Sequence, residues 1–337
     1  MRACIYGAGS LGTVLGAYVT KNGGQVDLIN RNKAHVEMLR KNGARIVGTV
    51  DMTVPVSAMT PDEMTGQYDL IILLTKQLAN AEVVKGLLPF LSGDGTIVTM
   101  QNGIPELGIA DVAGAERTVG CTVQWGATLL KPGVAELTSE PDSMNFGLGI
   151  IEGGNITKLG EIKRFLELMC PVEIEENFIG VRWSKLLINA AFSGMSAVTG
   201  TTFGEAAGNP ASRKYVQLLI KECIDVAAAA KITIAPVQGV NIVALLDYRN
   251  PLKKKIANML IPVVIKKHAR LKASMLQDLE NGKKTEVDCI NGIVCEYGKK
   301  YGVPTPANEM VVKIVHGIEE GKYQPSPENV KLFEKEI

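Results

Sequence analysis

The sequence contains no apolar run long enough to cross a bilayer, so we expect no transmembrane segment. Its first residues enter an apolar stretch at once, without the layout of a signal peptide. The 6 cysteines are scattered without a CxxC pair, which argues against a zinc site and against a disulfide framework. The 3 histidines are isolated and give no metal-ligand spacing. These absences predict a reduced, cytoplasmic protein without a bound metal.

An excess of charge of one sign is also missing. Lys and Arg total 36 against 35 Asp and Glu, so the formal net charge is +1, and we expect neither nucleic acid nor a membrane surface as a partner. Hydrophobic residues make up 46% and charged residues 21%, a composition typical of globular proteins rather than disordered ones. A chain of 337 residues is long enough for two hydrophobic cores.

The first half of the chain alternates short apolar runs with helical segments, a pattern typical of a parallel α/β sheet. The run Asp69–Thr75 is nearly all apolar, as expected for a strand buried on both faces. The predicted strands are Arg2–Tyr6, Val26–Ile29, Asp69–Thr75 and Thr96–Met100, with others near Thr118–Gln124, Val134–Thr138 and Met144–Leu148. The predicted helices are Ser10–Asn22, Ala79–Leu91 and Thr157–Leu168.

The second half has a different character. After about Val181 the apolar periodicity becomes long and helical, for example over Arg213–Ala230 and Val287–Tyr301, with few strand signals. We therefore expect a first domain over residues 1–178 and a helical second domain over 179–337, with a ligand-binding cleft between them.

A glycine-rich turn directly follows the first predicted strand. Its sequence, Gly7-Ala8-Gly9-Ser10-Leu11-Gly12, fits GxGxxG. The first glycine permits the tight turn, the second lets backbone approach a pyrophosphate, and the third lets helix and strand pack closely. The free N–H groups at the helix N-terminus then favour phosphate. The alternative is a glycine turn without a ligand.

The end of the second strand indicates which dinucleotide is bound. NAD-binding domains usually carry an acidic residue here for the ribose 2′-hydroxyl. This strand ends at Asn30 and Arg31 without an acid at its tip, and Asp27 lies too early. Because a guanidinium can pair with a 2′-phosphate, the sequence favours NADPH, with Asn30 and Arg31 as cofactor contacts. The alternative for Arg31 is a solvated loop cation.

Several motifs together resemble the ketopantoate reductase (2-dehydropantoate 2-reductase) family. They are Gly7–Gly12, Thr75-Lys76, Gln101-Asn102-Gly103, Trp183–Leu186 with Asn189, Ser274–Asp278 and Thr285–Gly292. The resemblance implies a Rossmann-type doubly wound parallel sheet followed by an all-helical C-terminal domain like that of 6-phosphogluconate dehydrogenase. It also implies reduction of ketopantoate to pantoate, on the route to pantothenate and coenzyme A.

Reduction of a 2-keto acid requires a proton donor beside the carbonyl oxygen. Lys185, Asn189 and Ser193 recur at intervals of i and i+4, so on a helix they share one face. The resemblance makes Lys185 the proton donor and Asn189 a substrate ligand, with Ser193 standing where family members often carry a second Asn. Without the family motif, Lys185 would be read as a solvated surface charge.

Glu286 precedes a strongly apolar helix. The structural interpretation is a first-turn carboxylate, with Thr285 as the helix cap and Asp288 at the capping-box position. The resemblance places Glu286 in the active site, where it hydrogen-bonds cofactor or substrate, and both interpretations can hold together. An ionised Glu286 could also hold Lys185 in its charged form.

The remaining candidate contacts follow the ends of strands or begin a helix. Asn102 follows the predicted strand Thr96–Met100, at the sheet edge where ligands bind in this architecture, and is expected to hold substrate or ribose. Asn-Gly is also an ordinary turn signal. The resemblance adds Lys76 and the backbone of Gly126 as cofactor contacts and Ser274 as a substrate ligand.

Two further interpretations stay open at this point. The protein could reduce another 2-keto acid, or it could bind NADPH as a regulatory protein without catalysis. The segment Val237–Lys272, longer than in compact family members, carries a basic cluster and an apolar stretch. It could reshape the pocket, because it runs into Ser274, or form a solvated helical hairpin or an oligomer contact. The apolar C-terminal helices would suit a homodimer.

Overall fold

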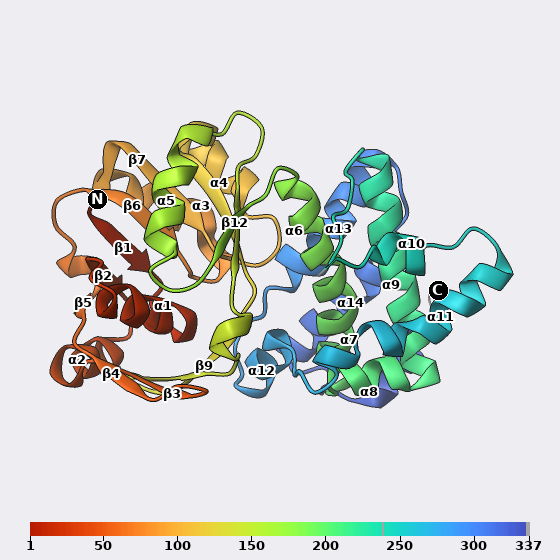
Figure 1. Ribbon diagram of the computed structural model, residues 1–337. Coiled ribbons are helices and arrows are strands. Elements are labelled where there is room, and N and C mark those ends of the chain that lie inside the picture. Colours follow the sequence, from red (N-terminus) through yellow and green to blue (C-terminus); the bar gives the residue numbers. More distant parts are fainter. Residues whose placement is uncertain (238, 335–337) are drawn as a thin grey trace. The chain divides into compact units, whose positions relative to one another are not determined.

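Two units of the chain are distinguished by their internal contacts. The structure, a computed structural model, describes residues 1–237 and 239–334, so residues 238 and 335–337 of the predicted second domain lie outside the described residues. The first unit comprises residues 1–101 and 105–178, and the second comprises 102–104 and the chain from 179 onward. Figure 1 colours the first unit red to yellow-green and the second mainly green to blue.

The first unit contains a sheet of 8 strands in the order β12-β11-β8-β7-β6-β1-β2-β5. Its strands are β1 (Ala3–Tyr6), β2 (Val26–Ile29), β5 (Ser57–Met59), β6 (Tyr68–Leu73), β7 (Leu91–Thr99), β8 (Thr118–Val123), β11 (Phe146–Gly149) and β12 (Val172–Ile174). The strands β8, β7, β6, β1, β2 and β5, which are neighbours in this order, all run parallel, with β6 and β1 at the centre. This is the arrangement of a dinucleotide-binding sheet. The predicted Rossmann-type doubly wound sheet is confirmed.

Helices cover both faces of this sheet. They are α1 (Ser10–Lys21), α2 (Lys33–Asn42), α3 (Asn80–Leu87), α4 (Glu106–Ala113) and α5 (Leu159–Leu166). In β6, Leu70 and Ile72 belong to one buried cluster and Ile71 and Leu73 to another, because successive side chains of a strand point to opposite faces. The strand β6 is therefore buried on both faces of the sheet, which explains its uninterrupted apolar run.

A second, smaller sheet is inserted in the first unit, and we did not predict it. Its strands are β3 (Ala44–Gly48), β4 (Met52–Val54), β9 (Ala127–Lys131) and β10 (Val134–Leu137), in the order β4-β3-β10-β9. Only β10 was expected from its apolar pattern. Of the other strands, β4 has only three residues and β9 carries mostly exposed side chains, so neither shows a strand pattern. β3 does alternate buried and partly buried positions, and we missed that signal.

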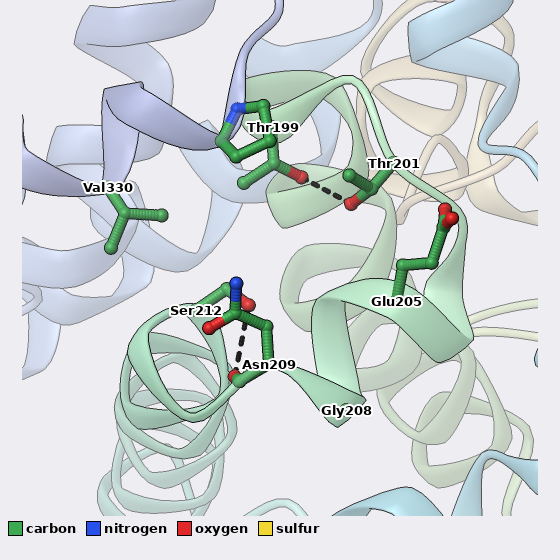
Figure 2. Close-up of a pocket in the computed structure, with 8 residues that line it drawn as sticks. Thr199, Thr201, Glu205, Gly208, Asn209, Ser212 and Val330 are labelled. Carbon is green, nitrogen blue, oxygen red and sulfur yellow. Dashed lines mark hydrogen bonds between the residues drawn. The ribbon is translucent and has the colours of Figure 1, made fainter.

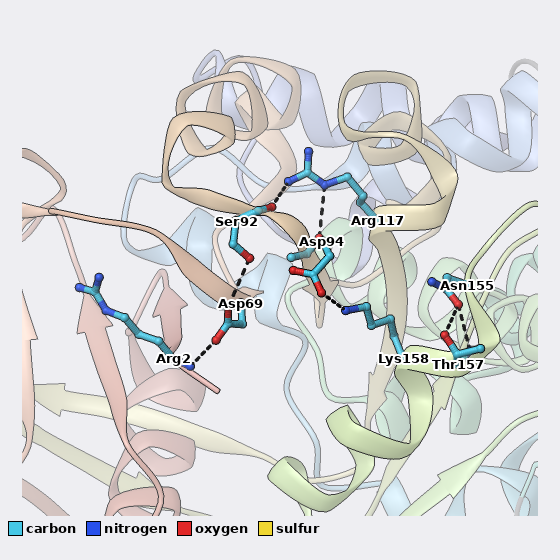
Figure 3. A network of polar contacts seen from close by, with 9 residues as sticks. Arg2, Asp69, Ser92, Asp94, Arg117, Asn155, Thr157 and Lys158 are labelled. Atoms are coloured by element: carbon cyan, nitrogen blue, oxygen red, sulfur yellow. Dashed lines mark hydrogen bonds and ion pairs between the residues drawn. The ribbon is translucent and has the colours of Figure 1, made fainter.

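Polar contacts join the amino ends of the central strands (Figure 3). The backbone N–H of Arg2 donates to Asp69 Oδ2 at 2.8 Å, and Ser92 Oγ donates to Asp69 Oδ1 at 3.3 Å. Arg117 donates to Ser92 O at 2.7 Å. These contacts secure the sheet edge opposite the carboxyl ends of the strands, where ligands bind in this architecture.

The second unit is helical, as predicted. Its helices are α6 (Phe178–Ile188), α7 (Gly194–Thr199), α8 (Phe203–Gly208), α9 (Pro210–Ala229), α10 (Ile242–Leu246), α11 (Pro251–Val264), α12 (Ser274–Glu280), α13 (Val287–Tyr301), α14 (Pro306–Glu319) and α15 (Val330–Phe333). The long helix α9 packs against α8, α13, α14 and α11. The segment after Val237 forms α10 and α11, which pack on each other and on α9. None of the described helices is long and apolar enough to cross a membrane.

Candidate functional site

The glycine-rich turn lies between β1 and α1. Gly7 has a φ of +98°, and its N–H donates to Ile29 O at 3.0 Å. A Cβ on Gly7 would lie 2.6 Å from Thr75 N, the backbone that follows β6. The first glycine is thus required both by its positive φ and by the close approach of a neighbouring strand end.

The other two glycines of the turn differ in what surrounds them. A Cβ on Gly12 would lie 2.9 Å from Ile5 Cγ2, so this glycine allows α1 to pack on β1. The atom nearest to a Cβ on Gly9 would be Gly7 O at 3.9 Å, so the chain itself leaves room there. No side chain caps α1, whose first residues Ser10 and Leu11 are partly exposed. This arrangement fits a dinucleotide whose pyrophosphate approaches Gly9 and the helix N-terminus.

The end of β2 carries the residues expected to choose the cofactor. Asn30 Nδ2 donates to Ala8 O at 2.8 Å, so the Asn30 amide is used to hold the glycine turn. Arg31 is exposed and near enough to Tyr6 for its charge to oppose the rise that burial causes in the pKa of that phenol. Asp27 accepts hydrogen bonds from Ser57 Oγ at 2.6 Å and Tyr68 Oη at 2.9 Å. The only acid of this strand is therefore engaged elsewhere.

His35 is a residue of this region that sequence reasoning missed. Its side chain is fully buried; Nε2 lies 3.0 Å from Ala8 O, and Nδ1 accepts from Gly133 N at 3.0 Å. Because Nδ1 is an acceptor, the proton resides on Nε2 and is donated to Ala8 O. Burial lowers the pKa of His35, although the bond to Ala8 acts in the opposite direction. A neutral imidazole thus ties the glycine turn to the loop between β9 and β10.

The pKa of His35 gives an expected pH dependence of stability. A folded-state pKa below the ordinary 6.5 means that the unfolded chain binds more protons in acid, so the stability from neutral His35 is present above pH 6.5 and lost below it. In thermal unfolding between pH 7.5 and 5.5, His35→Gln should flatten the slope by up to about 1.4 kcal/mol per pH unit. The exposed His268→Gln serves as the control, and identical slopes for wild type and His35→Gln would contradict the assignment.

The carboxyl ends of β6 and β7 are joined by Gln101, a buried residue to which we had assigned no role. Its Nε2 donates to Thr75 O and to Asn80 Oδ1, each at 2.7 Å. Two predicted contacts are neighbours in sequence of Gln101 and of its partner Thr75. Lys76 follows Thr75 and is partly buried, and Asn102 follows Gln101 but groups with the second unit.

Gly126 lies beyond the carboxyl end of β8. Its N–H donates to Ser139 Oγ at 2.9 Å, and its carbonyl accepts from Thr138 N at 3.0 Å. Since β8 pairs in parallel with β7, Gly126 follows the same edge of the sheet as the glycine turn, Lys76 and Gln101. The predicted cofactor contacts of the first unit therefore share one sheet edge.

In the second unit, Lys185, Asn189 and Ser193 lie on one continuous helical stretch. Lys185 belongs to α6 and is partly buried; Ser193 is 6% exposed. Asn189 begins a π-helical turn, Asn189–Ser193, which joins α6 to α7. The step of four residues from Lys185 to Asn189 is slightly more than one α-helical turn, so it rotates Asn189 past Lys185 about the helix axis. The step of four residues from Asn189 to Ser193 is less than one turn of the wider π-helix, so it rotates Ser193 in the opposite sense. The π turn thus brings Ser193 back toward the line of Lys185.

Ser274 and Glu286 lie at the starts of two other helices of this unit. Ser274 is exposed at the first position of α12, which packs on α7 and on the π turn. Glu286 is itself the residue that precedes α13, one position later than the predicted cap, while Thr285 Oγ1 accepts from Val287 N at 3.3 Å. The Thr285 hydroxyl donates to Glu319 Oε1 at 2.7 Å, and Asp288 faces His316 Nε2 at 3.1 Å, so the expected capping box does not form.

A pocket of about 330 Å³ in the second unit lies away from these residues. It is lined by the ends of α7 and α8, as Figure 2 shows. Its hydroxyl groups are already used: Thr199 and Thr201 bond each other at 2.6 Å, and Ser212 donates to Ala206 O at 2.7 Å. Within the described part of the chain, no group of three or more His, Cys, Asp or Glu residues could hold a metal ion.

Both units of the chain match one protein family. Residues 3–149 match the family described as Ketopantoate reductase PanE/ApbA, and residues 177–319 match Ketopantoate reductase PanE/ApbA C terminal. The 2-dehydropantoate 2-reductase of Pyrococcus horikoshii is 28% identical over 319 residues, covering 94% of this chain and 96% of that protein. The 2-dehydropantoate 2-reductase of Aquifex aeolicus is 27% identical over 320 residues, again covering 94% and 96%.

Solved structures share the fold. A PanE/ApbA family ketopantoate reductase from Ralstonia eutropha JMP134 superposes with a TM-score of 0.81 at 23% identity, covering 96% of this chain and 99% of that one. A D-mandelate dehydrogenase determined with NADH and anilino(oxo)acetate gives a TM-score of 0.80 at 24% identity, covering 95% and 99%. With the matches to both units, this chain belongs to the ketopantoate reductase PanE/ApbA family.

Proposed function

We propose that the protein reduces 2-dehydropantoate (ketopantoate) to (R)-pantoate with NADPH. The observation that carries the proposal is the row of Lys185, Asn189 and Ser193 along one helical stretch, with the helix of Ser274 packed against it. An ammonium, an amide and hydroxyls are the groups that a 2-keto acid requires for protonation and for binding of its carboxylate. The curated relatives named 2-dehydropantoate 2-reductase support this substrate.

The proposed roles follow from this chemistry. The bound reduced nicotinamide supplies a hydride to the carbonyl carbon. Lys185 Nζ donates a proton to the carbonyl oxygen as negative charge develops there, so that the product is an alcohol. Asn189, Ser193, Ser274 and Asn102 bind the substrate oxygens. Glu286 stabilises the charged form of Lys185 and contacts cofactor or substrate.

NADPH rather than NADH is proposed on the basis of Arg31. It is exposed at the end of β2, while Asp27 is bonded to Ser57 and Tyr68 and is not placed to accept a ribose hydroxyl. Arg31→Ala should reduce the ratio of kcat/KM with NADPH to that with NADH by about tenfold, because an exposed guanidinium–phosphate pair contributes roughly 1.4 kcal/mol. Arg40→Ala, at an exposed salt bridge with Glu63, is the matched control. An unchanged ratio in Arg31→Ala would exclude this role.

The decisive experiment is NADPH oxidation measured with a panel of 2-keto acids, repeated with NADH. Ketopantoate should give the highest kcat/KM. The second candidate function, reduction of another 2-keto acid, is favoured by the similarity to D-mandelate dehydrogenase and by Ser193, where family members often carry Asn. An aromatic 2-keto acid as the best substrate would establish that candidate. Tight NADPH binding without turnover of any keto acid would instead indicate a regulatory protein.

We also propose a homodimer formed through α11. This helix exposes a stripe of four large apolar side chains: Leu252 70%, Ile256 49%, Met259 66% and Val263 65%. Their spacing reads the same in both directions, so a twofold axis can place the stripe on that of a second copy. Lys253 and Lys255 lie beside the N-terminal half of the stripe only. In an antiparallel pair of α11 helices they would face the other copy's C-terminal half, around Leu260, which carries no charge. Sedimentation equilibrium should give a dimer mass for wild type and a monomer mass for Ile256→Lys/Met259→Lys.

A further inference from the structure

The π turn at Asn189–Ser193 changes the backbone hydrogen bonds of the helix around it. In an α-helix the N–H of Gly194 would donate to the carbonyl four residues earlier, that of Ala190. Here the Gly194 N–H donates to Asn189 O and Ala191 O instead. The turn therefore takes from Ala190 O the donor that an α-helix would provide, and a buried carbonyl needs a replacement.

Asn291 supplies that replacement from another helix. Its Nδ2 donates to Ala190 O at 3.0 Å, across 101 residues of sequence, and its side chain is 0% exposed. The same Nδ2 donates its second hydrogen to Asn308 Oδ1 at 2.9 Å. Asn291 thus lies between the π turn and α14, and its amide is the donor that complements the altered backbone.

A partly buried carboxylate determines the orientation of these amides. Glu222 in α9 accepts from Ala307 N at 2.8 Å, Asn308 N at 2.9 Å and Asn308 Nδ2 at 2.7 Å. Because Asn308 Nδ2 is committed to Glu222, its Oδ1 faces Asn291, and Asn291 must in turn present its Nδ2. The chain from Glu222 through Asn308 to Asn291 therefore aims an N–H at the π turn.

Gly194 allows the close approach that this contact needs. A Cβ on Gly194 would lie 3.0 Å from Asn291 Oδ1 and 3.1 Å from its Nδ2. Asn291 Oδ1 is itself buried without a hydrogen-bond partner among the described residues. An apolar residue of similar volume would avoid that cost, so filling of the core does not explain an asparagine at this position.

We infer that Asn291 is a positioning residue for substrate binding: it holds the π turn that presents Asn189 and Ser193 to the keto acid. This inference rests on the proposed function, in which these two side chains bind substrate. Without the bond to Ala190 O, the turn can relax toward α-helical bonding, in which each N–H donates to the carbonyl four residues earlier instead of five. That change would rotate the side chain of Asn189 relative to that of Ser193. Asn291 itself need not touch the substrate for this effect.

Asn291→Leu removes the donor and keeps the volume. We expect KM for ketopantoate to rise about tenfold, the effect of one lost hydrogen bond of roughly 1.4 kcal/mol, with kcat changed less than about threefold. The dissociation constant of NADPH should remain the same. Phe333→Ala in α15, which removes the buried ring that packs on Tyr215 of α9, is the destabilising control and should lower Tm without raising KM.

The sharper test repeats Asn291→Leu in a protein that already lacks both presented side chains, Asn189→Ala/Ser193→Ala. If Asn291 acts through them, the substitution should raise KM no further in this background. An equal rise in both backgrounds, or no rise in the wild-type background, would overturn the inference. If Asn291→Leu does not fold, Gly194→Ala decides the same comparison, because its methyl group displaces the Asn291 amide.

A readout without catalysis separates this inference from the proposed function. Hydrogen–deuterium exchange of the amides over 189–194 should become faster in Asn291→Leu but not in Phe333→Ala. If the wild-type protein reduces no 2-keto acid, the proposed function is excluded. Hydrogen–deuterium exchange then still tests whether Asn291 holds the π turn. Unchanged exchange in Asn291→Leu would overturn the role of Asn291 even in an active enzyme.

Discussion

Lys185→Ala is expected to lower kcat for ketopantoate reduction by about 10²–10⁴-fold, the usual contribution of a positioned general acid. NADPH affinity should be nearly unchanged, because Lys185 belongs to α6 of the second unit whereas the glycine turn belongs to the first. The measurement is steady-state reduction with saturating NADPH, together with a titration of NADPH fluorescence for the dissociation constant.

Two variants control this result. Lys185→Arg keeps the positive charge but replaces a group that can give up its proton with one that stays protonated, so kcat should also fall while substrate binding is largely retained. Lys214→Ala removes an exposed lysine of α9 and should leave kcat unaltered. A Lys185→Ala enzyme with wild-type kcat would mean that another group donates the proton.

Gly9→Ala is expected to weaken NADPH binding by about 100-fold while hardly changing Tm. The chain leaves room for the new methyl group, with Gly7 O at 3.9 Å, so folding should tolerate it. A pyrophosphate that approaches the backbone here would be displaced, and the loss of one hydrogen bond to a charged group costs about 1.5–3 kcal/mol, which includes the roughly 2.8 kcal/mol of a 100-fold change. Isothermal titration with NADPH and a thermal melt of the apoprotein measure the two quantities.

The neighbouring glycine provides the opposite case. Gly12→Ala would place a methyl group 2.9 Å from Ile5 Cγ2, so it should lower Tm by pushing α1 away from β1. Gly86→Ala in α3, where nothing lies within 4 Å, should leave both NADPH affinity and Tm near the wild-type values. If Gly9→Ala binds NADPH as tightly as Gly86→Ala does, the pyrophosphate is not bound at this turn.

The sequence was most informative where structure depends on short-range patterns. The predicted strand Val26–Ile29 and the predicted helix Val287–Tyr301 coincide with β2 and α13, because apolar periodicity and flanking glycines mark their ends. The helix predicted over Ala79–Leu91 corresponds to α3, which already ends at Leu87, and β7 begins at Leu91. An apolar run cannot by itself distinguish a helix from a buried strand, so the boundary was placed too late.

The features that depend on distant residues were not predictable. The spacing of Lys185, Asn189 and Ser193 in the sequence does not reveal whether they lie on an α-helix or across a π turn. Asn291, whose amide donates to the carbonyl that the turn leaves without its α-helical donor, belongs to another helix. His35 looked like an isolated histidine because its partners, Ala8 and Gly133, lie far from it in sequence. The capping box expected from Thr285 and Asp288 does not form, because these side chains bond to Glu319 and His316 of another helix, α14.

The bond from Asn30 to Ala8 O restricts how the dinucleotide preference of this protein can be redesigned. Asn30 Oδ1 also accepts the N–H of Asn32, and Asn32 in turn caps α2 by accepting from His35 N. An acid grafted at position 30 to bind a ribose hydroxyl would therefore also remove the bond that Asn30 makes to the glycine turn. Arg31 is exposed, whereas Asn30 and Asn32 hold the glycine turn and the start of α2, so cofactor engineering should begin with Arg31 alone.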